Sequence, residues 1–174
     1  MYPLTLTPEP VQQRSFVWLR PLLPGDLGWV ISRHGAVYAS EYGLDRSFEV
    51  KVAEIVVEVM RNFDRDRDAA WIAEYEGRPV GSVFVVNAGD DTAKLRLLIV
   101  DREARGQGVG RILTAAAIGF AREAGYKRMV LWTMGMLAAA RTIYTKAGFR
   151  LTESVPGISF GCHIIDETWE LDLD

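Results

Sequence analysis

A glycine-rich turn, Arg105-Gly106-Gln107-Gly108-Val109-Gly110, is the segment of this sequence best suited to hold an anion. An apolar strand predicted over residues 92–100 leads into the turn, and an amphipathic helix begins in it. The alternating glycines leave backbone N–H groups unshielded, and a helix N-terminus concentrates free N–H donors and partial positive charge. Arg105 and Arg111 add full positive charges at the two ends. The turn therefore predicts a diphosphate site, and a flexible loop with solvated arginines is the alternative.

Two common diphosphate motifs do not fit this turn. The dinucleotide pattern G-x-G-x-x-G fails because Arg111 stands where its third glycine would be. No G-K-[ST] follows, so the phosphate loop of nucleotide triphosphatases is excluded as well. The predicted strand is also the fourth of the chain and follows a meander, which is not where a dinucleotide fold places such a turn.

Two further groups of polar side chains could do chemistry. His34, Tyr38 and Glu41 are spaced i, i+4 and i+7, so they lie on one face of a predicted helix, with Tyr42 beside them. An exposed helix end is the alternative for this face. Lys94 and Arg96 alternate with leucines on a predicted strand, so both basic side chains share one face of the sheet. That face either borders a site for an anionic ligand or pairs with acids at the surface.

The elements that must position these residues follow from hydrophobic periodicity and from glycine and proline breaks. The predicted order is β-α-α-β-β-β-α-β-α-β-β, a mixed α/β domain that begins its sheet with a meander. We expect residues 1–14 to be a flexible N-terminal segment and residues 15–174 to form the domain. The predicted strands are 15–20, 71–75, 80–86, 92–100, 128–133, 149–152 and 168–173, and the predicted helices are 26–43, 47–63, 109–124 and 137–146.

Composition bounds the classes of function. A chain of 174 residues with 49% hydrophobic and 25% charged residues suits one soluble domain. The net charge of -3 argues against nucleic acid as a partner, and no apolar run is long enough for a membrane helix. Cys162 is the only cysteine, and neither a signal peptide nor a disulfide is expected, which favours the cytoplasm. Two histidines and one cysteine without ligand spacing do not support a metal site.

Two motifs together carry a family resemblance. Arg105-x-x-Gly108-x-Gly110 resembles the [QR]-x-x-G-x-[GA] motif of the GNAT superfamily of N-acetyltransferases, which cradles the pyrophosphate of acetyl-CoA. Residues 140–149, ARTIYTKAGF, resemble the superfamily's A-x-x-[LI]-Y-x-K-x-G-F one strand further on. Leu137 departs from the pattern, because many relatives carry Asn there. The resemblance covers roughly residues 16–173, and it implies a mostly antiparallel central sheet flanked by helices.

The sequence is also similar to the acetyltransferase domains often fused behind a MarR-type regulator. The similar stretches are Arg33-His34-Gly35-x-x-Tyr38-x-x-Glu41-Tyr42-Gly43, residues 93–98, residues 131–133 and residues 167–171. We expect no preceding DNA-binding domain in this chain, which would then be the catalytic half standing alone. Many relatives are dimers, so the resemblance makes a homodimer possible.

The resemblance implies roles on the donor side. A splay between the strand at 92–100 and the next strand would expose Leu98, Ile99 and Val100 to pantetheine and acetyl, and a backbone N–H there would stabilise the oxyanion. Tyr144 matches the tyrosine that commonly protonates the coenzyme A thiolate, with plain aromatic packing as the alternative. The other expected acetyl-CoA contacts are Arg105, Gly106, Gln107, Gly108, Val109, Gly110, Arg111, Arg141 and Lys146.

On the acceptor side, the resemblance places the first two helices along the substrate site. His34 or Glu41 could then accept the amine proton, with His163 and Glu170 as weaker candidates. The expected substrate contacts are Tyr38, Tyr42, Lys94, Arg96 and Trp132. The resulting prediction is acetyl transfer from acetyl-CoA to a primary amine of a small, amino acid-like molecule. A non-catalytic acyl-CoA-binding module and a protein or peptide N-acetyltransferase are the alternatives.

Overall fold

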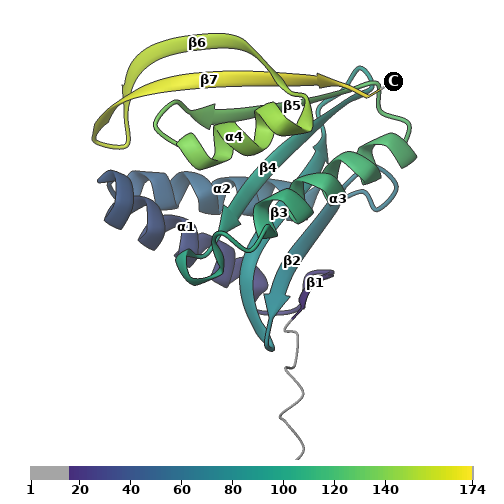
Figure 1. Cartoon of the computed structure of the whole chain (residues 1–174), viewed down its shortest axis with the longest axis horizontal. Coiled ribbons are helices and arrows are strands. Elements are labelled where there is room, and N and C mark those ends of the chain that lie inside the picture. Colours follow the sequence, from purple (N-terminus) through teal and green to yellow (C-terminus); the bar gives the residue numbers. More distant parts are fainter. Residues whose placement is uncertain (1–15, 174) are drawn as a thin grey trace, which may run out of the picture.

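The structure of the protein is a computed structural model that describes residues 16–173 (Figure 1). The predicted flexible segment 1–14 lies outside the described residues. The elements are β1 (Val17–Arg20), α1 (Asp26–Tyr42), α2 (Arg46–Arg61), β2 (Ala69–Tyr75), β3 (Arg78–Asn87), β4 (Thr92–Val100), a short 3-10 turn η1 (Arg102–Ala104), α3 (Val109–Glu123), β5 (Arg128–Met134), α4 (Ala138–Ala147), β6 (Arg150–Ser159) and β7 (Cys162–Asp172). The predicted order of strands and helices is confirmed.

The seven strands of residues 16–173 form one sheet in the order β1-β2-β3-β4-β5-β7-β6. Every neighbouring pair is antiparallel except β4 and β5, which are parallel and joined through α3. The predicted mixed, mostly antiparallel sheet is therefore confirmed. Figure 1 shows α1 and α2 on one face of this sheet and α3 and α4 on the other.

Alternation along β3 explains the two layers. Val83 and Val85 belong to the core cluster that includes Leu113 of α3, whereas Phe84 belongs to the cluster that includes Val52 of α2. Successive strand residues point to opposite faces of a sheet, so an unbroken apolar run on β3 serves both helical layers. Val83, Phe84 and Val85 are all fully buried.

The sheet opens in its middle, between β4 and β5. The two strands pair only from Thr92 to Leu95 on β4 and from Arg128 to Leu131 on β5, and beyond these residues they diverge. A bulge lies just past this point, since Leu97 has a left-handed φ of 52° and the register with β3 shifts there. The expected splay is therefore present. It leaves a gap in the sheet that side chains from both strands can line.

The last two strands are much longer than the sequence predicts. β6 and β7 form a long antiparallel hairpin that turns at Phe160 and Gly161, whereas the prediction kept only residues 149–152 and 168–173 as strand. Pro156 lies within β6, which is an edge strand, where a proline without an N–H is tolerated. The hairpin brings Phe160 to the start of α2, where its ring lies 5.1 Å from that of Phe48.

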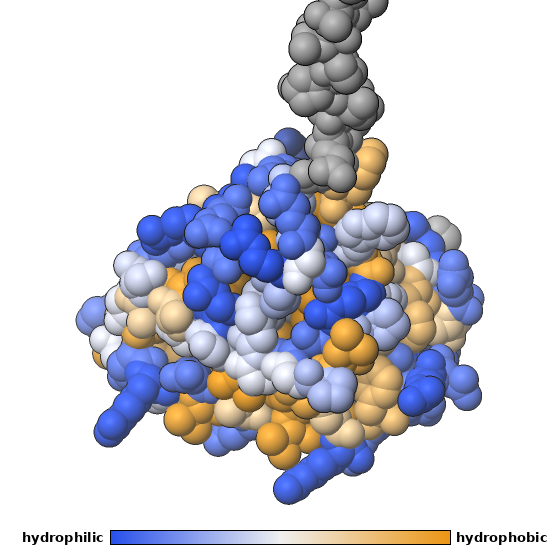
Figure 2. All heavy atoms as spheres, turned by 90° about the horizontal axis from the view of Figure 1, so that it is seen from below, coloured by the Kyte–Doolittle hydropathy of each residue, from blue (hydrophilic) through white to orange (hydrophobic). Residues whose placement is uncertain are grey.

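The helix ends agree with local chemistry. α1 ends where Gly43 adopts a left-handed φ of 72°, and its N–H donates to the carbonyl of Ala39. α2 begins after Asp45, whose carboxylate accepts a hydrogen bond from the Ser47 N–H at 2.8 Å. In the described part of the chain, no helix combines the length and the apolar character that crossing a membrane requires. On the face shown in Figure 2, apolar residues lie interspersed among hydrophilic ones.

Candidate active site

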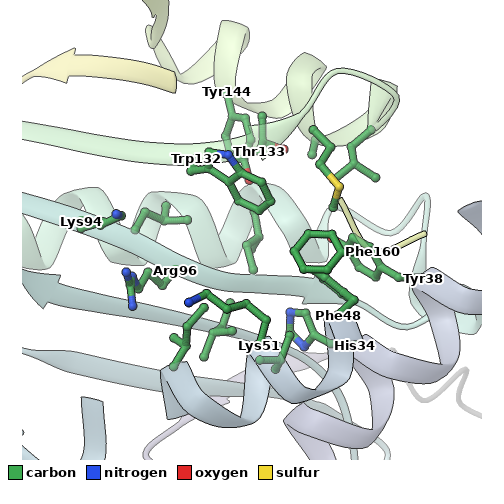
Figure 3. A pocket seen from close by; sticks show the side chains of 18 residues that line it. His34, Tyr38, Phe48, Lys51, Lys94, Arg96, Trp132, Thr133, Tyr144 and Phe160 are labelled. Atoms are coloured by element: carbon green, nitrogen blue, oxygen red, sulfur yellow. The ribbon is translucent and has the colours of Figure 1, made fainter. Parts of the chain in front are cut away.

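Two adjoining hollows meet where β4 and β5 separate. The first, the glycine-turn cleft, has a volume of about 440 Å³ and is lined mainly by the end of β4, the glycine-rich turn and α4. The second, the aromatic cavity, has a volume of about 300 Å³ and lies between α1, α2, β4, β5 and the β6–β7 hairpin (Figure 3). Both are lined by Tyr38, Leu98, Leu137 and Ala140. A molecule bound in one hollow can therefore reach a molecule bound in the other at these four residues.

The glycine-rich turn fits a diphosphate. Gly106 and Gly108 have left-handed φ values of 77° and 79°, which residues other than glycine rarely adopt. Both glycines line the cleft. Gly108 precedes α3, and no side chain caps this helix end, so the first N–H groups of α3 face the cleft without a capping partner. Gly110 allows close packing, since a Cβ there would lie 2.6 Å from Cδ1 of Ile143, and that side chain would have to move. The loop therefore brings α3 close to α4 while keeping its backbone donors accessible.

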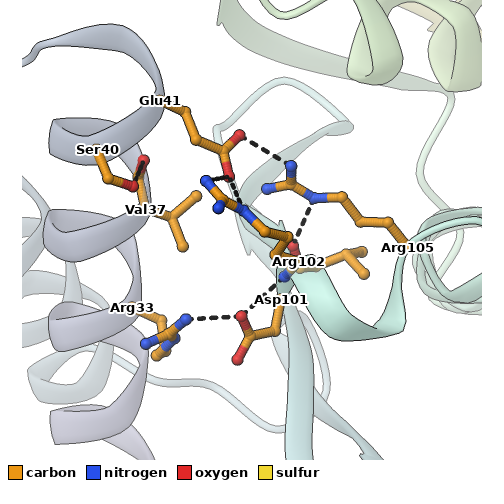
Figure 4. A network of polar contacts seen from close by, with 8 residues as sticks. Arg33, Val37, Ser40, Glu41, Asp101, Arg102 and Arg105 are labelled. Atoms are coloured by element: carbon orange, nitrogen blue, oxygen red, sulfur yellow. Dashed lines mark hydrogen bonds and ion pairs between the residues drawn. The ribbon is translucent and has the colours of Figure 1, made fainter.

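Arg105 is held at the edge of this cleft by a carboxylate of α1. Its Nη1 donates to Oε2 of Glu41 at 2.8 Å, and its Nε donates to the carbonyl of Val100 at 3.3 Å (Figure 4). Arg102 donates to the other carboxylate oxygen of Glu41 at 3.3 Å. The hydrogen bond from Arg105 is the main cause that lowers the pKa of Glu41. Arg33 and Asp101 form a second ion pair across the same gap, at 2.6 Å.

Glu41 consequently does not join His34 in a common site. It lines neither hollow, and its ionised carboxylate is paired with two guanidinium groups. A carboxylate held in this way is a poor proton acceptor, because its pKa lies below the ordinary range. The structure instead places Glu41 between α1 and the glycine-rich turn, where it fixes the position of Arg105.

The bulge on β4 exposes backbone at the junction of the two hollows. Leu97 and Leu98 have no register partner on β3 or on β5, and both line the aromatic cavity. The Ser82 hydroxyl donates to the Leu97 carbonyl at 2.8 Å and so anchors the bulge. Leu98, Ile99 and Val100 all line the glycine-turn cleft, as the resemblance implied for the donor side. A left-handed leucine is a strained conformation of the kind that clusters at functional sites.

Tyr144 lies on α4 one turn after Ala140, and it points toward the aromatic cavity (Figure 3). Its side chain is buried, and its ring lies 5.8 Å from that of Phe149 and 6.3 Å from that of Trp169. Within residues 16–173 its hydroxyl makes no hydrogen bond, although buried tyrosine hydroxyls usually find a partner. Burial raises the pKa of Tyr144, so the hydroxyl keeps its proton at neutral pH. It is therefore available as a proton donor to a bound molecule.

His34 lies on α1 on the opposite side of the cavity. Its ring is buried, and Nδ1 lies 2.8 Å from the carbonyl of Val30. Burial lowers the pKa of His34 to about 4, so the ring is neutral at pH 7. A neutral ring that donates from Nδ1 to a carbonyl has an unprotonated Nε2, which can accept a hydrogen bond. Tyr38 stacks on this ring at 5.9 Å, which fixes its orientation.

Basic residues occupy the other end of the aromatic cavity. Lys94 and Arg96 line it from β4, as the alternation along the predicted strand indicated, and Lys51 lines it from α2. Trp132 lines the same cavity from β5, and its indole N–H donates to Asp166 at 3.1 Å. The cavity thus combines an apolar, aromatic wall with a cationic end.

Several predicted acetyl-CoA contacts lie elsewhere. Arg141 donates to Glu167 at 3.1 Å and lies over the ring of Trp169, outside both hollows. Lys146 is exposed on α4 and also lines neither hollow. Gln107 donates to the carbonyl of Glu103 at 3.4 Å and does not line the cleft. Of the predicted charged contacts for the donor, the structure brings only Arg105 and Arg111 to the cleft.

Three predicted residues on the acceptor side also lie apart from the aromatic cavity. Tyr42 lines the glycine-turn cleft, one turn further along α1 than Tyr38. His163 lies on β7 beside the hairpin turn, and Glu170 is paired with Arg128 at 3.7 Å. Neither of the last two lines the cavity. His34 is therefore the predicted base candidate that the structure brings to it.

Several residues that line the cavity were not predicted from the sequence, and among them Lys51 has a recognisable sequence signal. Phe48, Lys51, Val52 and Ile55 follow the i, i+3, i+4, i+7 spacing of one helix face, and all four line the cavity. A charged residue inside an apolar stripe marks a face that borders a site. Thr133 and Phe160 also line the cavity. Nothing in the local sequence distinguishes them, because they arrive through the splay and through the long hairpin.

The comparisons with known proteins agree with this geometry. Residues 38–149 match the acetyltransferase (GNAT) family. A mycothiol acetyltransferase of Amycolatopsis mediterranei is 29% identical over 84% of this chain and 50% of its own length. An N-acetylaspartate synthetase of Danio rerio is 37% identical over 46% of this chain and 29% of its own length. The chain thus spans half or less of the length of these two curated relatives.

Solved structures share the fold. The protein yncA of Salmonella typhimurium, solved with its cofactor acetyl-CoA, superposes with a TM-score of 0.74 and 19% identity, covering 91% of this chain and 94% of that one. The family match covers both sequence motifs, the splayed strands β4 and β5 and most of the residues that line the two hollows, but not His34 or Phe160. The chain therefore belongs to the GNAT family of acetyltransferases.

Proposed function

We propose that the protein transfers the acetyl group of acetyl-CoA directly to the primary amine of a small molecule. The observation that carries this proposal is the junction of the glycine-turn cleft with the aromatic cavity at Leu98 and Ala140. A donor bound along the cleft and an acceptor bound in the cavity would meet there, beside the unpaired backbone of the β4 bulge. Holding two reactants in this way removes much of the entropic cost of their encounter.

Acetyl-CoA, when bound, supplies a thioester carbonyl as the electrophile. The first N–H groups of α3 and the Arg105 and Arg111 side chains would hold its diphosphate. The bulged backbone at Leu97 and Leu98 would direct an N–H toward the oxygen that becomes negative during attack. The acetyl-CoA present in the structure of yncA supports the choice of donor.

The chemical step forms a C–N bond and breaks the C–S bond. The amine must attack in its neutral form, and Nε2 of His34 would accept a hydrogen bond from it and orient its lone pair. After attack, the nitrogen of the tetrahedral intermediate is more acidic than a free ammonium, so it can pass its proton to water; the lowered pKa of His34 makes that ring a poor proton acceptor. Tyr144 would give its proton to the departing thiolate and regain one from solvent. This assigns His34 as the residue that orients the amine and Tyr144 as the acid.

The size and wall of the cavity favour a small acceptor over a peptide. A volume of about 300 Å³ lies at the lower end of ligand sites and suits a small molecule such as an amino acid. The Phe160 ring packs against Phe48 and encloses the cavity from the side of the hairpin. Two relatives, the mycothiol acetyltransferase and the N-acetylaspartate synthetase, are named for small-molecule substrates or products.

The test is to incubate the protein with acetyl-CoA and a panel of amines and to follow free thiol. We expect thiol release that depends on a small amine, with the N-acetylated amine identified by mass spectrometry. Calorimetric binding of acetyl-CoA without turnover on any amine would instead identify a non-catalytic acyl-CoA-binding module. Turnover confined to peptide N-termini or lysines would identify a protein acetyltransferase. Gel filtration of the same sample tests the proposed homodimer.

A further inference from the structure

Three basic side chains converge at one end of the aromatic cavity. Lys94 and Arg96 are two residues apart on β4, so they project from the same face, and Lys51 approaches from α2. Figure 3 shows the ends of these three side chains gathered on one side of the cavity, away from Tyr144, Tyr38 and His34. We call these three residues the cationic end. No Asp or Glu is among the residues that line the cavity in the described part of the chain.

The protein itself neutralises this charge only weakly. Arg96 lies 3.7 Å from Glu58, and Lys51 lies 3.6 Å from Glu54. The two carboxylates are 69% and 63% exposed, so water and salt screen both pairs. Lys94 is half-buried, and among residues 16–173 no carboxylate lies within ion-pair distance of it. Loss of hydration and the nearby Arg96 charge lower the pKa of Lys94. An incoming anion would relieve both effects.

The donor does not account for the cationic end. The glycine-turn cleft has its own basic residues, Arg105 and Arg111, and it shares none of the three cations with the aromatic cavity. Leu98 and Leu137 separate the two sets of charges, because these residues line the junction. Three cations at one end of an acceptor cavity are therefore positioned for the acceptor itself.

We propose that the cationic end binds a doubly negative group, so that the acceptor is a primary amine carrying either two carboxylates or one phosphonate or phosphate ester. This inference rests on the proposed acetyl transfer at the other end of the cavity. One carboxylate would satisfy Arg96, whose guanidinium pairs with two oxygens at once, and would leave Lys51 and Lys94 without a partner. A second negative charge matches them. Polyamines and other polycations are disfavoured by the same charges.

The test compares acceptors that differ in one charge. L-aspartate is paired with L-asparagine, and 2-aminoethylphosphonate with β-alanine, while ethanolamine serves as the acceptor without an anion. We expect kcat/KM to be about tenfold higher for the dianionic member of at least one pair, since an added charge pair in a partly buried site is worth about one power of ten. The pair that shows the larger ratio distinguishes a dicarboxylate from a phosphonate.

Variants locate the effect. Lys94→Met and Lys51→Met should each reduce the preference for the dianion toward unity, while KM for acetyl-CoA stays unchanged and shows that the protein is folded. Lys127→Met is the matched control, because Lys127 is exposed in the loop before β5 and should leave the preference intact. The proposal would be overturned if both members of each pair were turned over equally, or if the preference survived in Lys94→Met and Lys51→Met. Neither result would contradict acetyl transfer itself.

If no amine is acetylated, the proposed function fails, and binding still tests the cationic end. Ethylphosphonate and propionate are then titrated calorimetrically into the protein loaded with coenzyme A. Tighter binding of ethylphosphonate that is lost in Lys94→Met supports a site for a doubly negative group. Equal binding of the two anions contradicts it.

Discussion

Replacing Tyr144 by phenylalanine isolates the proposed proton donor. The ring contacts with Phe149 and Trp169 do not involve the hydroxyl, and the hydroxyl has no hydrogen-bond partner in the described part of the chain. Removing it should therefore change the free energy of unfolding by less than about 1 kcal/mol. A positioned general acid contributes at least about a hundredfold to the rate, so kcat should fall by about that factor, with KM for acetyl-CoA nearly unchanged.

The assay is a single turnover with protein in excess over acetyl-CoA, because a slow product release would hide the chemical step. Tyr126→Phe is the matched control. Tyr126 is buried too, but it lines neither hollow, and its hydroxyl donates to the carbonyl of Arg67 at 2.7 Å. We expect this variant to lose about 1 kcal/mol of stability and no activity. A single-turnover rate within twofold of wild type in Tyr144→Phe would refute the role of Tyr144 as the acid.

Three other substitutions test the remaining parts of the site. His34 has its pKa lowered from 6.5 to about 4, so its contribution to stability is present above pH 6.5 and is lost as the pH falls toward 4. His34→Gln should remove this pH-dependent loss of unfolding free energy, which is at most about 1.4 kcal/mol per pH unit. The measurement is urea unfolding at a series of pH values. Parallel pH profiles for the two proteins would contradict the burial of a neutral His34. Glu41→Gln releases Arg105, so we expect KM for acetyl-CoA to rise about threefold with kcat unchanged. This size follows because an ion pair of this kind is worth up to about 1 kcal/mol. A lower KM would mean that Glu41 competes with acetyl-CoA for Arg105. Gly108→Ala forces alanine into a left-handed conformation, which should cost about 1 kcal/mol of stability and raise KM for acetyl-CoA. Gly119→Ala is the control, because a Cβ at this position inside α3 meets nothing within 4 Å. We expect it to leave KM for acetyl-CoA unchanged.

Local patterns predicted the helices and the position of the glycine-rich turn well. Each of the four helices has an apolar stripe and a recognisable end, such as Gly43 after α1 and Gly148 after α4. Every such signal lies within or next to the helix that it defines. The glycine-rich turn is equally local, since its conformation depends on glycines at positive φ. Features of this kind are visible in a single sequence.

Features that depend on contacts between distant segments were predicted poorly. Seven residues along α1 return Glu41 to the face of His34 but move it about 10 Å along the axis, where it meets the arginines after β4 instead of the cavity. Arg141 lies in the second motif but points to Glu167 on β7, a strand that the sequence showed only in part. Leu97 gave no local sign of its left-handed conformation, which the splay and the neighbouring strand impose.

The most direct test of the account follows a labelled acetyl group through one turnover. The protein is mixed with acetyl-CoA labelled in the acetyl group and with the preferred dianionic amine, and the reaction is quenched at short times for mass spectrometry. Direct attack at the junction of the two hollows predicts that labelled N-acetyl amine appears at the same rate as free thiol, while the mass of the protein does not change. A labelled acetyl-protein that forms before the amine is acetylated, or thiol release without any acetylated amine, would contradict it.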